Sequence, residues 1–240
     1  MLYVTGDTHG DLERFKTKEA KQLKKGDILL VCGDFGFVWD GSQQERRQLH
    51  WLGSRRYQVL FLDGTHDNLD LLAQYPQEPL YGGLARRVDG NCWYLERGEV
   101  YEAQGIRFFV LGGGESQDMD TRIQGETWWP QELPSPQELE RARENLRACG
   151  DQVDYLFTHE PSAIVSHFLE MDATHASPLS AFLDRVSQEV SFTRWYFGSL
   201  HLDKPIPPRH QAVYQRILPV GPKQQAPGPL ARLFGGRQPR

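Results

Sequence analysis

The stretch that decides the fold lies at the start of the chain, at residues 2–10, LYVTGDTHG. A short run of β-forming residues ends at Gly6, and a carboxylate, an imidazole and a second glycine follow within four residues. Glycine permits the sharp turns that direct side chains from a strand end into a shared site. Residues i and i+2 of an extended chain point to the same side. Asp7 and His9 are therefore predicted to reach one metal ion together.

The rest of the chain repeats this order of short β-rich run, turn and helical segment. The predicted strands are Leu2–Thr5, Ile28–Cys32, Val59–Leu62, Ile106–Leu111, Asp154–Thr158 and Phe192–Phe197. The predicted helices are Asp11–Leu23, Gln43–Leu52, Asn68–Tyr75, Pro136–Ala148 and Ser177–Val190. Strands that alternate with helices predict an α/β fold, and the hairpin-like segment Trp93–Leu111 adds antiparallel pairing. We expect two packed mixed sheets, a β-sandwich flanked by helices.

The composition of the chain indicates how many domains it forms and which partners are not expected. With 240 residues, 39% hydrophobic and 25% charged, the chain suits one globular domain, predicted over residues 1–220. The net charge of -5 gives no reason to expect nucleic acid or an anionic membrane as the main partner. No apolar run approaches the roughly 20 residues of a membrane span, and no secretory signal is expected, so a cytoplasmic location is predicted. The three scattered cysteines are predicted to be reduced.

The end of the chain differs in composition from the rest. Residues 204–240 hold seven Lys or Arg and no acid, and residues 221–240 are rich in Pro, Gly and Gln. A flexible basic tail is predicted there. It is either a tether for nucleic acid or acidic partners or a solvated terminus, and the solvated terminus is favoured.

Polar residues gather at the carboxyl ends of the predicted strands, which is where α/β folds place their sites. Four of the eight histidines lie at such ends. Taken singly, each of these residues is more simply explained as a hydrogen-bonded core histidine or a helix-capping aspartate. The set is Asp7, His9, Asp34, His66, Asp67, His159 and His201.

The order of these motifs carries more information than any one of them. Five motifs follow one another between Leu2 and His201: Asp-x-His, Gly-Asp, Gly-x-His-Asp, a separate His and Gly-x-x-His. This order of motifs resembles that of the calcineurin-like metallophosphoesterases. The residues around the motifs are similar to those of a small bacterial and phage-type branch of this family. The resemblance implies that Asp7, His9, Asp34 and His201 hold a first metal ion. Mn or Fe is expected, and Zn is an alternative.

The second metal of the family is matched less well. The resemblance assigns Asp34 and His159 to it, but Thr65 stands where the family has an Asn and Ser199 where it has a His. Neutral hydroxyls bind divalent ions weakly, so one or two ions per chain are expected. Glu160 is a candidate replacement carboxylate that we do not assign.

The implied reaction is hydrolysis of a phosphate ester by a metal-activated hydroxide. His66, backed by Asp67, would stabilise the transition state and protonate the leaving oxygen, while Asp67 could also cap the following helix. The substrate is expected to be a phosphomonoester, a phosphodiester or a phosphoprotein. The alternative is a degenerate family member that serves as a binding or regulatory module. Nucleic acid as the target is a third, less favoured interpretation.

Two further features are compatible with substrate binding. The segment Gly112–Ser116 follows a predicted strand and could present backbone N–H groups to a phosphate, with Arg122 as an anion clamp. A turn with an exposed Arg122 is an equally good interpretation. Trp128 and Trp129 are expected to pack in the core in preference to lining a cleft.

Overall fold

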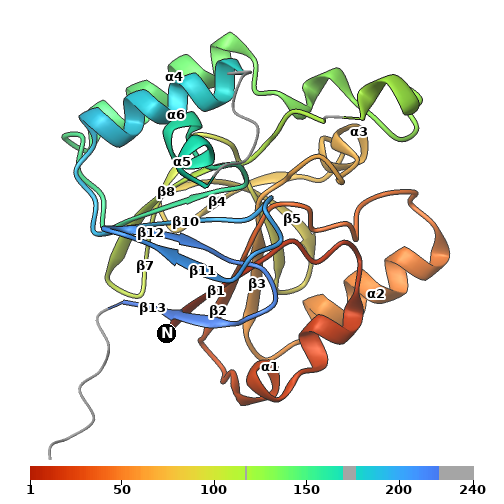
Figure 1. Cartoon of the computed structure of the whole chain (residues 1–240). Coiled ribbons are helices and arrows are strands. Elements are labelled where there is room, and N and C mark those ends of the chain that lie inside the picture. The colour runs from red at the N-terminus through yellow and green to blue at the C-terminus, as the bar shows by residue number, and fades with distance from the viewer. Residues whose placement is uncertain (117, 170–176, 222–240) are drawn as a thin grey trace, which may run out of the picture.

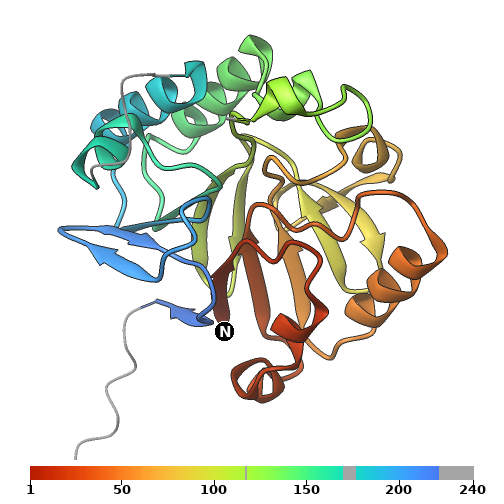
Figure 2. The ribbon, with the colours of Figure 1, turned by 45° about the vertical axis from the view of Figure 1, so that its right-hand side comes forward.

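The protein folds into two mixed β-sheets flanked by helices, as the sequence predicts. The structure, a computed structural model, describes residues 1–116, 118–169 and 177–221. Helices α4–α6 cover one side of the strands and α1 and α2 cover the other, a division that both ribbon views show (Figures 1 and 2). In the described residues, no helix has the length and apolarity needed to cross a membrane.

The first sheet has seven strands in the order β13-β1-β2-β3-β6-β5-β4. β1, β2, β3 and β6 are parallel, and antiparallel strands close both edges. Its strands are β1 (Leu2–Gly6), β2 (Ile28–Cys32), β3 (Gln58–Phe61), β4 (Gln77–Leu80), β5 (Gly83–Asp89), β6 (Cys92–Leu95) and β13 (Leu218–Val220).

The second sheet has six strands in the order β11-β12-β10-β9-β8-β7. β12, β10, β9 and β8 are parallel, and antiparallel strands again form the edges. Its strands are β7 (Val100–Ala103), β8 (Ile106–Leu111), β9 (Tyr155–Thr158), β10 (Arg194–Phe197), β11 (Lys204–Ile206) and β12 (His210–Ala212). The carboxyl ends of the central strands are thus brought together within each sheet.

Three apolar clusters hold these layers together. Alternate residues of a strand face opposite sides, so Leu30 of β2 and Val110 of β8 belong to the cluster between the sheets. Val31 of β2 packs under α2, and Phe109 of β8 packs under α4 and α6. Because both faces of the central strands are buried, their sequences are apolar throughout, as is usual for parallel strands.

The helices follow the predicted positions, with two corrections in length. They are α1 (Lys18–Gln22), α2 (Gln43–Gly53), α3 (Leu69–Leu72), α4 (Pro136–Ala148), α5 (Ala163–Phe168) and α6 (Pro178–Glu189). The predicted helix Asp11–Leu23 is divided by Thr17, which is extended and caps α1 by accepting a hydrogen bond from the Ala20 N–H. The part of the predicted helix before Thr17 is a 3-10 helix, Leu12–Lys16. The predicted helix Asn68–Tyr75 is a single turn, since Pro76 disfavours helical backbone at the residue before it.

The expected hairpin Trp93–Leu111 is wrong in its extent. β6 pairs with β3 and β5 in the first sheet, and only β7 and β8 pair with each other, through a Gln104-Gly105 turn with positive φ at both residues. β4, β5, α5 and the three strands after β10 were not predicted, because most are short and all carry few apolar residues in a periodic pattern. Of the predicted flexible tail, residues 221–240, residues 222–240 lie outside the described residues.

A buried ion pair ties the first sheet to the segment before α4. Arg97, after β6, binds Asp63, after β3, and its Nε lies 3.0 Å from Asp63 Oδ2. Arg97 also donates to the carbonyls of Gln131 and Glu132. Burial acts to lower the pKa of Arg97, but the Asp63 carboxylate outweighs burial and raises that pKa. Arg97 is therefore buried as a cation, and each partner depends on the other for its burial.

We expect Arg97→Met to lower the free energy of unfolding by about 3–5 kcal/mol, because it leaves the Asp63 carboxylate buried without its cation. Urea unfolding followed by circular dichroism would measure the change as a shift in midpoint at constant slope. Arg107→Met is the matched control, since Arg107 is exposed and pairs with Glu102 at 3.5 Å. It should cost about 0–1 kcal/mol. Equal losses in the two variants would contradict the role given to the buried pair.

Candidate metal centre

The candidate site lies where the parallel strands of both sheets end. Asp7 directly follows β1, Asp34 lies two residues after β2, His159 directly follows β9, and His201 lies in the loop after β10. Strands of both sheets therefore contribute ligands to one place. The sequence predicted the strand ends, and the packing of the two sheets brings them together.

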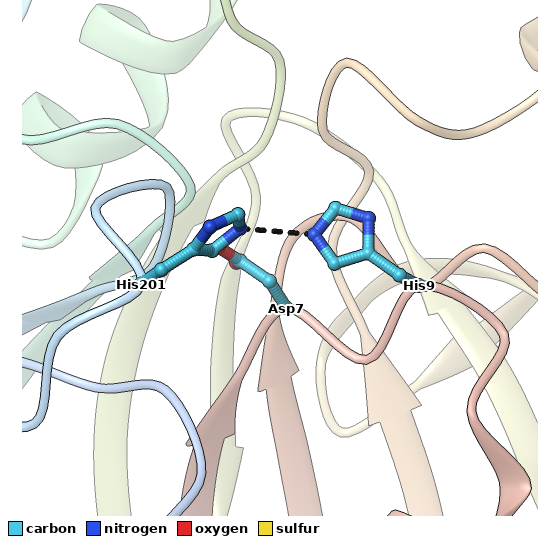
Figure 3. A group of neighbouring side chains, drawn as sticks. All are labelled: Asp7, His9 and His201. Carbon is cyan, nitrogen blue, oxygen red and sulfur yellow. Dashed lines mark hydrogen bonds and ion pairs between the residues drawn. The ribbon is translucent and has the colours of Figure 1, made fainter.

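Asp7, His9 and His201 form the exposed side of the centre (Figure 3). The Nε2 atoms of His9 and His201 face each other at 3.0 Å, and His201 Nε2 lies 3.3 Å from Asp7 Oδ2. Asp7 is fully buried, whereas the two imidazoles are partly open to solvent. The donor atoms of the three residues thus converge on one point that solvent can reach.

Asp34 and His159 form the buried side. His159 Nε2 lies 3.5 Å from Asp34 Oδ1, and His159 Nδ1 lies 3.7 Å from Asp7 Oδ1. Asp34 Oδ2 also lies 3.7 Å from His9 Nε2. Asp7, Asp34 and His159 all have ligand atoms within 4.8 Å of one another. The structure therefore brings together all five residues predicted as metal ligands.

Backbone strain is concentrated at this centre. Seven non-glycine residues of the described chain have left-handed φ, and four of them lie here: His9 (46°), Asp34 (43°), Ser199 (65°) and His201 (51°). Such a conformation costs about 1–3 kcal/mol for each residue and persists where surrounding contacts enforce it. Here the Asp34 carbonyl accepts hydrogen bonds from the N–H groups of Thr8 and His9. These bonds lock the loops after β1 and β2 together.

Two glycines allow the ligands to approach each other. A Cβ atom on Gly64 would lie 2.1 Å from Asp34 Oδ1 and 2.8 Å from His159 Nε2. A Cβ atom on Gly198 would lie 2.3 Å from Asp7 Oδ1. Any side chain at either position would displace a carboxylate of the centre.

The surroundings of the centre shift the pKa values of Asp7 and Asp34 in opposite directions. Burial raises the pKa of Asp7 to about 6, although the charge of His159 opposes this. Burial also opposes the ionisation of Asp34, but the charge of His159 and a hydrogen bond from His66 outweigh it and lower the pKa of Asp34. Burial would lower the pKa of His159, yet Asp34 and Asp7 raise it to about 9. The centre therefore favours positive charge beside its carboxylates.

These groups fit a divalent cation. Asp7 Oδ2 is buried and accepts no hydrogen bond from the described residues, although His201 Nε2 lies 3.3 Å away, and a bound cation would compensate this oxygen. Three imidazoles and two carboxylates form the donor set of these five residues, and no thiolate of the described residues takes part. Such a set suits Mn, Fe or Zn.

His66 joins the centre, but its partner is not Asp67. His66 Nδ1 lies 3.0 Å from Asp34 Oδ2, and His66, His9 and Asp34 have converging ligand atoms. The Asp67 carboxylate is fully buried and accepts hydrogen bonds from the N–H groups of Phe35, Gly36 and Gly64. The expected pairing of Asp67 with His66 is thus corrected, because Asp67 fixes the loops that carry the ligands. The helix cap expected of Asp67 is supplied by Asn68.

Comparison with known proteins adds to this geometry. Residues 1–196 match the family described as Calcineurin-like phosphoesterase. The chain belongs to the calcineurin-like phosphoesterase family. Lariat debranching enzyme A of Xenopus laevis is 28% identical over 130 residues, a match that spans 47% of this chain and 23% of that relative. The phosphopantetheinyl hydrolase of Mycobacterium tuberculosis has a similar fold, with a TM-score of 0.50, 15% identity and coverage of 95% of this chain and 98% of that one.

This calcineurin-like chain departs from the family pattern at Thr65 and Ser199, where the resemblance implies ligands of a second metal. The Thr65 hydroxyl lies 3.1 Å from His66 Nδ1, so it contacts the imidazole. Glu160 Oε1 accepts a hydrogen bond from the Glu115 N–H at 2.7 Å, and it does not join the converging ligand atoms of the described residues. Glu160 therefore stays unassigned as a ligand.

The glycine-rich segment does not present its amides to a ligand. The N–H groups of Gly113 and Gly114 donate to the carbonyls of Asp63 and Glu132, and the Ser116 hydroxyl is buried against the Glu132 carboxylate. Of the two interpretations that the sequence leaves open, these contacts favour a structural turn, but Arg122 is not exposed as that interpretation supposed, since its side chain is 12% exposed. Trp129 is buried, as expected, with its ring edge against Trp39 at 5.3 Å between centroids.

Sequence analysis missed Tyr214, whose ring packs on His201 with centroids 4.8 Å apart. The Asp203 carboxylate accepts a hydrogen bond from the Tyr214 N–H at 2.9 Å and holds this loop in place. Tyr214 comes after the last motif and carries no family signature. No sequence signal could have placed it beside a metal ligand.

We expect Mn²⁺ to raise the midpoint of thermal unfolding of the wild type, since a ligand at 100 times its Kd stabilises the native state by about 2.7 kcal/mol. Asp34→Asn should abolish this shift and weaken Mn²⁺ binding by at least about 100-fold, the upper end of losses measured for outer-shell partners. Calorimetric titration and thermal scans would measure both. Asp154→Asn, at the opposite end of β9 from His159, is the control and should bind like the wild type. Equal binding by the Asp34 variant would refute the assignment.

Proposed function

We propose that this chain hydrolyses phosphate esters at the centre formed by Asp7, His9, Asp34, His159 and His201. The observation that carries the proposal is the convergence of these donor atoms around a buried Asp7 oxygen that accepts no hydrogen bond from the described residues. It supports the proposal because the family model that matches the chain is one of phosphoesterases. Mn or Fe is the proposed metal, with Zn as the alternative.

The division of labour follows from position. Asp7, His9, Asp34 and His201 would hold the first ion, and His159 with Asp34 would contribute to a second. When bound, a divalent ion supplies charge neutralisation for the phosphoryl oxygens and activates water for attack on phosphorus. The strained loops hold the ligands in place before the ion arrives, so little rearrangement is needed on binding.

His66 is the proposed proton donor to the leaving oxygen. Its Nδ1 atom is the ring nitrogen that faces the centre, 3.0 Å from Asp34 Oδ2. Its side chain is 42% exposed, so substrate can reach it. General acid catalysis by a histidine in this position contributes typically about 10²- to 10⁴-fold. Asp67 contributes indirectly, by fixing the Phe35, Gly36 and Gly64 amides.

A cavity of about 460 Å³ adjoins the centre and gives the leaving group its place. His9 and His66 form its inner end, and Trp39 forms a wall that Trp129 holds in place. Its volume suits a small leaving group.

The charge of this cavity points to the type of leaving group. Asp40 and Glu45 line it, and the described lining contains no Lys or Arg. Glu45 also accepts hydrogen bonds from the N–H groups of Trp39, Asp40 and Gly41, which shape the loop. Two carboxylates beside an indole favour a neutral or cationic leaving group.

The direct test is turnover of p-nitrophenyl phosphate and bis(p-nitrophenyl) phosphate with Mn²⁺. The wild type should turn over at least one of them, and Asp34→Asn should lower kcat by at least about 10³-fold through loss of the ion. Comparison of the two esters separates a phosphomonoesterase from a phosphodiesterase.

The double variant Thr65→Asn with Ser199→His provides the opposing control. It restores the family residues at the second metal position. A wild type without activity, together with clear activity in this variant, would refute the enzyme hypothesis and favour a binding or regulatory module.

The charge preference can be tested with two phenyl phosphates that carry trimethylammonium or carboxylate at the same ring position. We expect kcat/KM to favour the cationic ester by about tenfold at low salt, with the difference reduced in Asp40→Asn and by added salt. Asp154→Asn serves as the remote control. A preference for the carboxylate ester would contradict the proposed leaving-group site.

A further inference from the structure

His201 is the most exposed of the residues proposed to hold the first ion. Its side chain is 50% exposed, and its backbone has the left-handed φ of 51°. Its Nε2 atom faces Asp7 and His9 (Figure 3), but its Nδ1 atom has no hydrogen-bond acceptor among the described residues. Metal-binding histidines almost always donate that second N–H to an acceptor, which fixes the ring. The orientation of the His201 ring therefore depends on another contact.

The ring of Tyr214 supplies this contact. It packs on the His201 imidazole with the ring centroids 4.8 Å apart and the ring planes 30° apart. Tyr214 lies two residues after β12, the strand that pairs with β10 in the second sheet. Aromatic rings at this separation attract each other. The contact limits rotation of the imidazole and thus the positions that its Nε2 atom can take.

The backbone of Tyr214 is held against the end of β1. Its carbonyl accepts hydrogen bonds from the Gly6 N–H at 3.1 Å and from the Thr5 hydroxyl at 2.9 Å. Its N–H donates to Asp203 Oδ1 at 2.9 Å. β1 belongs to the first sheet and leads directly to Asp7. The residue that packs on His201 is thus fixed to the strand that carries another ligand.

Arg14, in the 3-10 helix Leu12–Lys16, joins the same two parts of the centre. Its Nη1 atom donates to the Asp7 carbonyl at 3.0 Å, and its Nη2 atom donates to the Tyr214 carbonyl. Its guanidinium carbon also lies 5.2 Å from the centroid of the Tyr214 ring, which is a cation–π contact. One side chain therefore contacts both the Asp7 backbone and the residue that packs on His201.

We propose that Tyr214 is a positioning residue that orients His201 for the first ion, and that Arg14 and Asp203 hold Tyr214 in place. The inference rests on the proposed role of His201 as a metal ligand, and it does not require the chain to hydrolyse esters. The Tyr214 hydroxyl makes no hydrogen bond among the described residues. The ring, and not the hydroxyl, therefore carries the effect.

The first test is calorimetric titration of the full chain with Mn²⁺. Tyr214→Leu should weaken binding by about 10- to 100-fold, as for other partners that orient a metal ligand, and Tyr214→Phe should stay within about twofold of the wild type. Equal affinities of Tyr214→Leu and the wild type would overturn the inference and leave the proposed function standing. A loss in Tyr214→Phe as large as in Tyr214→Leu would overturn it as well, because the hydroxyl would then be the active group.

The second test asks whether Tyr214 acts through His201. In a His201→Ala background the imidazole is absent, so Tyr214→Leu should cause no further loss of Mn²⁺ affinity. A change that only damaged the fold would weaken binding equally in both backgrounds. Additive losses would therefore overturn the inference. A wild type that binds Mn²⁺ but turns over neither nitrophenyl ester would refute the proposed function and leave the inference standing.

Trp51→Leu is the matched control. Trp51 lies on α2 with the Arg55 guanidinium carbon 3.7 Å from the centroid of its ring, so this change also removes a partly buried aromatic ring that carries an arginine. Trp51 does not line the cavity beside the centre, and Mn²⁺ affinity should be unchanged. Circular dichroism would show that each variant is folded. Tyr214→Met, which fills more of the same space, replaces Tyr214→Leu if the latter does not fold.

Discussion

The close approach of the buried carboxylates of Asp7 and Asp34 to His159 is the interaction on which the rest of the site depends. Two carboxylates within a few ångströms repel each other in a medium of low polarity, and each needs a cation or a hydrogen bond. His159 supplies part of that compensation from between them. Asp7 Oδ2, which accepts no hydrogen bond from the described residues and faces the partly exposed His201, marks what His159 leaves uncompensated. A metal ion is the group that removes this imbalance.

The fold holds this unfavourable arrangement in place by means of rigid surroundings. Parallel strands buried on both faces fix where each ligand loop begins. The loops themselves contain His9, Asp34, Ser199 and His201 in left-handed backbone conformations. The Asp67 carboxylate and the Asp34 carbonyl accept hydrogen bonds from the loop amides. These hydrogen bonds offset the free-energy cost of the strained backbone. The stable sheets thus preorganise ligand loops that would not hold this arrangement by themselves.

The two departures from the family pattern lie in different loops: Thr65 follows β3, and Ser199 follows β10, where its N–H donates to Asp7 Oδ1. Thr65 turns toward His66 and is held by Arg122, which connects the second-metal side with the segment before α4. On the other side, His201 is supported by Tyr214. The four residues proposed to hold the first ion converge in the structure, while the surroundings of His66 are formed by Thr65, Arg122 and Asp34.

The sequence by itself determined the α/β class, the central strands and the residues at their carboxyl ends, since apolar runs and turn residues are local signals. The sequence also predicted that Asp7, His9, Asp34, His159 and His201 belong to one centre. Only the tertiary structure decided that Asp34, and not Asp67, contacts His66, and that Arg122 reaches the same ring. The strands β4, β5 and β11–β13 were likewise not predicted, because they carry few apolar residues in a periodic pattern and acquire strand geometry from the neighbours they pair with. Local sequence patterns determine which residues lie at the ends of strands. The residues that contact them in the folded protein depend on how loops from distant segments pack together.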